Sequence, residues 1–299
     1  MDDKVIYYRK EDAGYPKRLL KLERMPVGLY VRGQLPEEER PAVAIAGARM
    51  CSAYGRDQAF YFGKVLAEHG VQIISGLAYG VDSYAHEGAL AGGGKTFAVL
   101  GCGVNICYPK ENYSLFCRIL EQGGGVISEF GKDAAPQSWH FPIRNRIISG
   151  LSEGILIIEA KRRSGSLITA DYALEQGKLV FALPGRAQDE LSYGCNHLIY
   201  QGAGIAYSPE VILEELGIRC RGKREIPAKI NKSFTKEIQR VYESLEVLPK
   251  SIGILLEETD LEMPDLSRIL LHLQVEGYAV EGPTNYYRKV ENKQERNLK

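Results

Sequence analysis

Short aliphatic runs alternate with amphipathic stretches between residues 41 and 218, and this alternation predicts the architecture. The aliphatic runs have the length and β-branched content of buried strands, while the longer stretches repeat their apolar residues at helical spacing. The expected strands are 43–46, 73–75, 96–100, 125–127, 155–158, 179–182 and 204–206. The expected helices are 55–69, one from 81, 112–122, one beginning after 166, 196–201 and 209–216.

Strands and helices that alternate in this way specify a parallel sheet with right-handed crossovers. We therefore expect a Rossmann-like α/β domain over residues 41–218, with helices on both faces of a mostly parallel sheet. Residues 1–40 are interpreted as an irregular extension that packs on this domain, in which 27–31 could pair as an edge strand. Ligands of such sheets lie beyond the carboxyl ends of the strands, so the glycine-rich turns there should meet at one crest.

The apolar pattern changes after residue 234. Helical spacing over 235–244, 252–257 and 264–276, followed by strands at 278–280 and 286–288, predicts a small winged-helix-like domain over 235–299. A basic linker, 219–234, precedes it, and the domain itself is acidic. Because phosphate contact requires positive charge, a regulatory or protein-contact role is favoured over DNA groove reading, which stays as the alternative.

Composition describes an ordinary globular protein of 299 residues, 44% of them hydrophobic and 25% charged. A formal net charge of +0 argues against a protein that coats nucleic acid through overall basicity. The chain shows neither a membrane-span run nor an apolar signal region, so we expect a cytoplasmic protein. The six cysteines lack CxxC spacing and are interpreted as incidental thiols.

The densest candidate chemistry lies at 139–169, around the predicted strand 155–158. An aromatic and basic cluster precedes the strand, and Ser164-Gly165-Ser166 follows it at the start of a helix, where free amides favour an anion. One ring and two guanidiniums beside such a helix end would suit a phosphate-bearing ligand with a flat base. The cluster consists of Phe141, Arg144, Asn145 and Arg146. Alternatively, both arginines are ordinary salt-bridge partners.

Arg49 follows the first predicted strand in Gly47-Ala48-Arg49, where a dinucleotide fold would have glycines. The GxGxxG pattern is missing, so an NAD site is not expected. A permanently charged side chain at the mouth of the crest would be costly there unless it met an anion. The alternative is a buried ion pair with Glu159 or Asp82.

Asp82 and His86 lie one helical turn apart and could form a proton relay. The favoured interpretation is that Asp82 stabilises a helix amino terminus and His86 is a packed polar side chain, since no nucleophile accompanies them. We find no HExxH, no nucleophile elbow and no acidic cluster for two metals. The sequence therefore predicts a binder rather than an enzyme, with no catalytic residue, metal or cofactor.

Nine segments, in order over nearly the whole chain, resemble the DNA-processing protein A (DprA/Smf) family. They are GYPKRLLKLERMPVGLYVRG, GARMCSAYG, ISGLAYGVDSYAH, VLGCGVNICYP, GGVISEF, FPIRNRIISGLS, IIEAKRRSGSLITADYALEQGK, ALPG and GCNHLIYQGA. The resemblance implies single-stranded DNA bound at the crest, a homodimer, and protection of incoming DNA with loading of a RecA-type recombinase during natural transformation. One departure is GAR, where the family commonly has GSR.

The family motifs also imply which residues contact DNA. Carried over position by position, these are Arg49, Ser75, Gly76, Phe141, Arg144, Asn145, Arg146, Lys161, Ser164, Gly165, Ser166 and Thr169. The alternative function is a nucleotide-binding or nucleoside-monophosphate-cleaving enzyme of related fold. Its PGGxGT signature is missing, and Pro184-Gly185-Arg186 is an incomplete echo of it.

Overall fold

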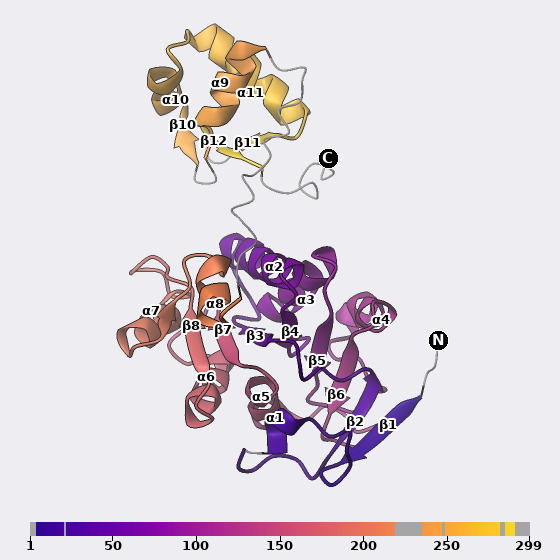
Figure 1. Ribbon diagram of the computed structural model, residues 1–299. Coiled ribbons are helices and arrows are strands. Elements are labelled where there is room, and N and C mark those ends of the chain that lie inside the picture. Colours follow the sequence, from indigo (N-terminus) through magenta and orange to yellow (C-terminus); the bar gives the residue numbers. More distant parts are fainter. Residues whose placement is uncertain (1–3, 21, 219–234, 247–248, 282–284, 291–299) are drawn as a thin grey trace. The chain divides into compact units, whose positions relative to one another are not determined.

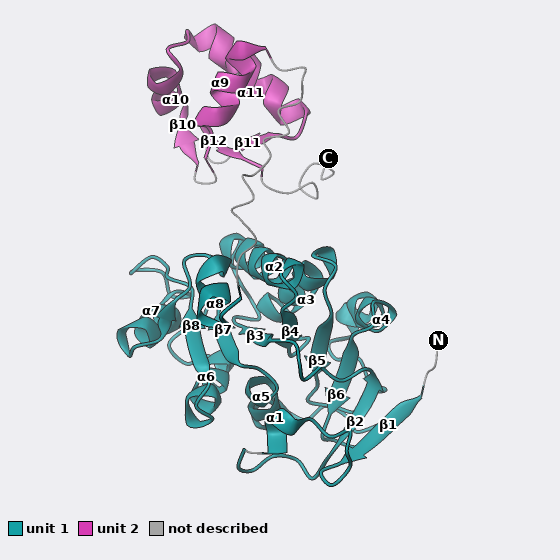
Figure 2. Ribbon diagram, viewed as in Figure 1, with its two compact units in different colours: residues 1–220 teal, residues 221–299 magenta. Residues whose placement is uncertain are grey.

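The computed structural model describes residues 4–20, 22–218, 235–246, 249–281 and 285–290. The chain forms two compact units, Met1–Cys220 and Arg221–Lys299 (Figure 2). The predicted basic linker, 219–234, lies outside the described residues, and the finer division of the chain at residues 40 and 234 stays a prediction.

Unit 1 is built on a nine-stranded sheet with the order β1-β2-β6-β5-β4-β3-β7-β8-β9 (Figure 1). All neighbours from β6 to β9 in this order pair in parallel, whereas β1 and β2 pair antiparallel with each other and β2 with β6. The predicted mostly parallel Rossmann-like sheet is confirmed. Its strands are β1 (Val5–Arg9), β2 (Gly28–Gly33), β3 (Ala42–Ala46), β4 (Gln72–Ser75), β5 (Thr96–Val99), β6 (Gly125–Ser128), β7 (Gly154–Ile157), β8 (Leu179–Ala182) and β9 (Gly204–Ile205).

Helices cover both faces of this sheet (Figure 1). Alternate strand residues point to opposite faces, so Ala42 and Ala44 belong to one core cluster and Val43 and Ile45 to another. One face carries α1 (Lys17–Leu20), α5 (His140–Gly150), α6 (Gly165–Glu175) and α7 (Tyr193–Tyr200). The other carries α2 (Ala53–Glu68), α3 (Val81–Ala91), α4 (Tyr113–Glu121) and α8 (Pro209–Glu215).

The amino-terminal region differs from its prediction in two ways. The segment expected as an edge strand is β2, an interior strand between β1 and β6, so the edge assignment is wrong. The edge is β1, in a region expected to be irregular. The residues of β1 are half-buried or exposed, so the segment lacks the apolar signal of an inner strand.

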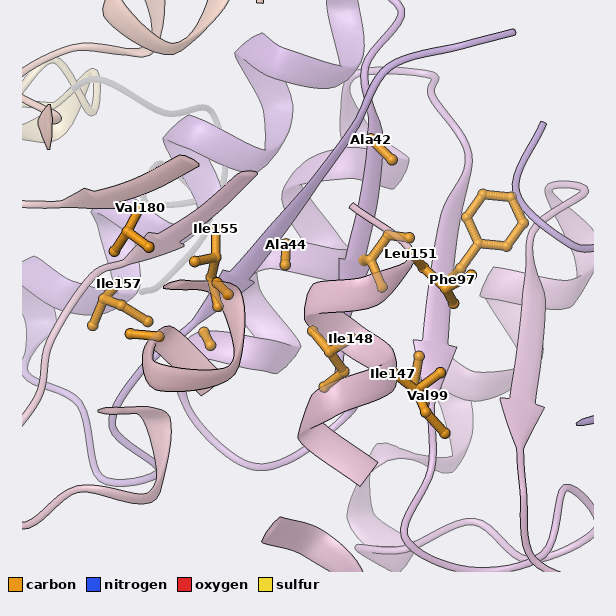
Figure 3. Packing of buried hydrophobic residues seen from close by; sticks show 14 of the residues in the cluster. Ala42, Ala44, Phe97, Val99, Ile147, Ile148, Leu151, Ile155, Ile157 and Val180 are labelled. Atoms are coloured by element: carbon orange, nitrogen blue, oxygen red, sulfur yellow. The ribbon is translucent and has the colours of Figure 1, made fainter. Parts of the chain in front are cut away.

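Helix α5 was also absent from the expected elements. Pro142 and the run Arg144-Asn145-Arg146 hide its periodicity, although proline is compatible with the first turn of a helix. Its second half is apolar, and Ile147 and Ile148 pack against the sheet in the same cluster as Val99 (Figure 3). This burial fixes α5 on the sheet and determines where its polar first half lies.

Unit 2 has its own core, which includes Val241, Leu255, Leu266, Leu270 and Tyr287. Its elements are α9 (Lys236–Ser244), β10 (Lys250–Ser251), α10 (Ile252–Thr259), α11 (Met263–Val275), β11 (Ala279–Glu281) and β12 (Tyr286–Lys289), with the antiparallel order β10-β12-β11. Three helices with a terminal antiparallel hairpin, which the short strand β10 extends to three strands, confirm the predicted winged-helix-like fold. In the portion of the chain that the structure describes, no helix is long and apolar enough to cross a membrane.

Candidate functional site

The strand order reverses between β3 and β7, and the main cavity lies at that point. The chain leaves β3 for α2 on one face and leaves β7 for α6 on the other, so the two loops diverge and open a crevice at the carboxyl ends. A cavity of about 420 Å³ is lined there by the loop after β3, the first half of α5 and the loop leading into α6. This volume is in the range of small-ligand sites.

Positive charge dominates the lining of this cavity. Arg49, Arg144, Lys161 and Arg163 contribute cations, and Asp82 is the carboxylate among the lining residues. Arg163 was not among the predicted site residues, although it lies in the same Lys-Arg-Arg loop as Lys161. Its place in that loop was the available signal, although the loop alone does not decide which cation faces the cavity, because Arg162 lies over the Tyr193 ring instead. A neutral chain therefore presents a locally cationic cavity.

Arg49 is exposed, and its guanidinium carbon lies 5.3 Å from the centroid of the Phe141 ring. Neither predicted carboxylate partner pairs with it. The Glu159 side chain instead accepts hydrogen bonds from the amide of Ser52 at 2.8 Å and from its hydroxyl at 2.5 Å. Among the residues that the structure describes, Arg49 forms no ion pair, so its charge is available to an anion in the cavity.

Arg144 is only 4% exposed, and its guanidinium is held by backbone carbonyls. Nη1 donates to the carbonyl of Gly76 at 2.8 Å and to that of Val99, and Nε donates to Oδ1 of Asn145 at 3.1 Å. Burial lowers the pKa of Arg144 to about 10, so the group stays charged at neutral pH. Since the side chain also lines the cavity, its remaining N–H groups can serve a ligand oxygen.

Asp82 and His86 have structural roles. Asp82 accepts hydrogen bonds from the amides of Gly76 at 3.1 Å and Ala78 at 3.4 Å, which fixes the loop before α3. Burial raises the pKa of Asp82, and the nearby Arg144 charge opposes this rise. His86 is fully buried with Nδ1 2.6 Å from Oγ1 of Thr96, and burial lowers the pKa of His86 to about 3. A neutral, packed His86 confirms the structural interpretation over a proton relay.

The start of α6 lines the same cavity as Arg49. The hydroxyl of Ser164 caps this helix by accepting from the amide of Ser166 at 3.4 Å. A Cβ added to Gly165 would meet no protein atom within 4 Å, so the backbone there faces open space. Lys161 lies on the same rim and pairs with Glu190 at 2.8 Å, an exposed contact of little strength.

Nine of the twelve predicted DNA-contact residues line the cavity, and three do not: Ser75, Gly76 and Arg146. Ser75 is buried and donates to the carbonyl of Ile45. A Cβ on Gly76 would overlap the Arg144 guanidinium, so this glycine makes room for that side chain. Arg146 pairs with Glu129 at 2.5 Å. The salt-bridge alternative is thus correct for Arg146 but not for Arg144. That the other nine contact DNA stays a prediction.

A family model described as DNA recombination-mediator protein A matches residues 6–217, which include every residue of this cavity. The chain belongs to this family. It is this family membership, and not the lack of a catalytic motif, that identifies the chain as a recombination mediator rather than an enzyme. The Pro184-Gly185-Arg186 turn does not support the alternative of a nucleotide-cleaving enzyme. The Gly185 amide donates to Asn196 Oδ1, and none of the three residues lines the cavity.

Two relatives align with most of this chain. Protein Smf of Escherichia coli is 40% identical over 281 residues, which are 92% of this chain and 75% of the relative. DNA processing protein DprA of Streptococcus pneumoniae is 44% identical over 209 residues, covering 68% of this chain and 72% of the relative.

Two solved structures share the fold at substantial identity. DprA from Streptococcus pneumoniae matches with a TM-score of 0.67 and 43% identity, covering 71% of this chain and 74% of that one. DNA processing protein A from Helicobacter pylori, which binds single-stranded DNA, matches with a TM-score of 0.63 and 31% identity, covering 72% of this chain and 98% of that one.

Proposed function

We propose that this recombination mediator binds single-stranded DNA in the cavity between β3 and β7. The observation that carries the proposal is the pair Arg49 and Arg144, two cations on one aromatic ring at the topological switch point with no ion-pair partner in the described residues. Family membership and the DNA-binding relative from Helicobacter pylori support the same conclusion.

The geometry favours an unpaired strand over a duplex. A concave cavity of about 420 Å³ can take a nucleotide with its phosphate, whereas the backbone of a duplex presents its phosphates on a convex surface. Arg49 and Arg144 would hold phosphate oxygens, the amides at the start of α6 would add donors, and Phe141 would offer apolar contact to a base. Base stacking on an aromatic ring contributes about 1–3 kcal/mol.

The test is a titration of single- and double-stranded oligonucleotides at two salt concentrations. We expect preference for the single strand and weaker binding at the higher salt concentration. Arg49→Ala should weaken binding by about tenfold or more, since a hydrogen bond to a charged group contributes about 1.5–3 kcal/mol. The plot of log affinity against log salt should become shallower by about 0.7 for each phosphate that the variant no longer neutralises.

Arg268→Ala is the matched control, because Arg268 is an exposed arginine of unit 2 that pairs with Asp265. Unchanged affinity and salt slope for Arg49→Ala would refute the proposal. The single tryptophan, Trp139, provides a readout without labels, since it is 58% exposed and lies between the lining residues Ser138 and Phe141. Its fluorescence should change on addition of oligothymidylate.

The partners follow from the proposed role. The protein would protect incoming single strands and load a RecA-type recombinase onto them during natural transformation or homologous recombination. A homodimer would place two cavities on one strand and raise avidity without new contacts. Faster nucleation of recombinase filaments on DNA bound by this protein, and a dimeric mass in light scattering, are the expected results; a monomer that leaves nucleation unchanged contradicts both.

A further inference from the structure

A second groove, of about 350 Å³, lies on the other side of Arg49. Its walls are the segment from Arg49 to Ala53, the first turn of α2, and the loop between β4 and α3. Arg49 and Met50 line both this groove and the main cavity, so the two hollows are neighbours along the crest. The parallel pairing of β3 with β4 explains this, because their carboxyl ends lie side by side.

The groove is cationic, and the charge comes from side chains rather than from the end of α2. Arg49 and Arg56 line it, and no carboxylate is among its described lining residues. Arg56 is about half exposed, and Asp57 contacts it at 3.8 Å, an exposed pair that binds weakly. The amino terminus of α2 already holds the Glu159 carboxylate through Ser52, so an added anion would depend on the arginines.

Two tyrosines give the groove aromatic surface. Tyr79 is 45% exposed, and its hydroxyl donates to Oε2 of Glu111 at 2.5 Å, which fixes the ring at the groove. The Arg56 guanidinium lies over the Tyr84 ring, 5.8 Å from its centroid. Gly80 brings this wall close to Arg49, because it has a φ of +73° and a Cβ there would overlap the Arg49 carbonyl oxygen.

We propose that this groove binds the next nucleotide of the single strand held in the main cavity, with the phosphodiester between Arg49 and Arg56 and the base against Tyr79. The inference rests on the proposed function and extends its site from one subsite to two. Shared use of Arg49 makes the strand continuous across the crest. The chemistry required is a phosphate next to an unstacked base, which a single strand repeats at every residue.

The experiment measures the affinity of the full chain for oligothymidylates of increasing length by fluorescence anisotropy. Wild-type affinity should rise when the oligonucleotide becomes long enough to fill both hollows. Arg56→Gln and Tyr79→Leu should each remove about tenfold from the affinity of the longer oligonucleotides and leave that of the shortest unchanged. Arg56→Gln should also lower the salt slope by about 0.7. Tyr79→Phe keeps the ring but loses the hydroxyl bond to Glu111, so it should lose less affinity than Tyr79→Leu.

The length dependence separates the second subsite from the first. If the groove variants lose nothing at any length while Arg49→Ala weakens all of them, the second subsite is refuted and the proposed function stands. Equal losses at every length would mean that the variants disturb the main cavity, which also refutes the subsite. If Arg49→Ala has no effect either, the proposed function itself fails. Should Tyr79→Leu lower the thermal midpoint, Arg56→Gln, an exposed change, decides the question alone.

Discussion

The crest of unit 1 and helix α11 of unit 2 both carry arginines, but in opposite settings. Arg144 is 4% exposed and donates to backbone carbonyls, whereas the Arg268 side chain is 73% exposed and pairs with Asp265 at 2.9 Å. Lys250 of unit 2 is likewise held by Glu246 and Glu258. Uncompensated charge, rather than the mere presence of arginine, therefore distinguishes the crest, because cations already paired with carboxylates, such as Lys250 and Arg268, have less to offer a phosphate.

The largest expected effect is that of Arg144→Gln, which tests the buried side of this comparison. The shorter, neutral side chain leaves the carbonyls of Gly76 and Val99 without their donor, and a broken buried polar network costs about 3 kcal/mol. Urea unfolding should show this decrease in stability, with weaker binding of single-stranded DNA in parallel. Arg268→Gln should change stability by less than about 0.5 kcal/mol; equal effects of the two variants would remove the contrast.

Substitutions of two glycines at the crest should distinguish the packing of Arg144 from the binding of DNA. Gly76→Ala should lower stability by about 1–3 kcal/mol, because the new methyl group would overlap the Arg144 guanidinium. Gly165→Ala meets open space and should leave the unfolding free energy nearly unchanged, while a methyl group on the cavity wall weakens DNA binding. Thermal unfolding and fluorescence anisotropy measured on both variants check whether one loses stability and the other loses DNA affinity. A stable Gly76→Ala variant with normal affinity would contradict the role given to Gly76.

A buried histidine of unit 1, His86, and an exposed one of unit 2, His272, extend the comparison to the pH dependence of stability. Burial lowers the pKa of His86 from 6.5 to about 3, so the unfolded chain binds this proton more readily. The stabilisation from neutral His86 is therefore complete above pH 6.5 and is lost as the pH falls toward 3. His86→Gln should reduce the acid sensitivity of unit 1 over that range, as measured by urea unfolding. His272→Gln, at an exposed position of α11, is the control; an unchanged slope for His86→Gln would refute the prediction.

The smallest expected effect comes from removing residues 235–299. Units 1 and 2 have separate cores, so the crest should keep its geometry without the tail. We expect the affinity for single-stranded DNA to change by less than about threefold, since Lys250 and Arg268 of unit 2 are already paired with carboxylates. A complete loss of binding would reverse the comparison and assign recognition to unit 2. An intact affinity with altered recombinase loading would support the regulatory or protein-contact role.

The sequence was sufficient for the parallel strands, because each is an apolar run whose burial on both faces needs no knowledge of its neighbours. The sequence also predicted that Arg49 lies at the crest, because the loop that follows an inner parallel strand lies at the carboxyl end of the sheet. The three helices and the terminal hairpin of unit 2 followed from periodicity, whereas the two-residue strand β10 did not. The distribution of charge could also be read from the sequence, which is why the acidic character of residues 235–299 was evident.

Only the tertiary structure determined what the side chains of Arg144 and Arg146, two residues apart, contact. In the sequence they are equivalent, but the helix α5 turns them to different sides, one toward the cavity and one toward Glu129. Likewise, Gly76 was predicted to contact a ligand, whereas its missing side chain makes room for Arg144. Periodicity reports which face of an element is buried, but what a polar side chain meets depends on segments far away in the chain, and only their packing determines that.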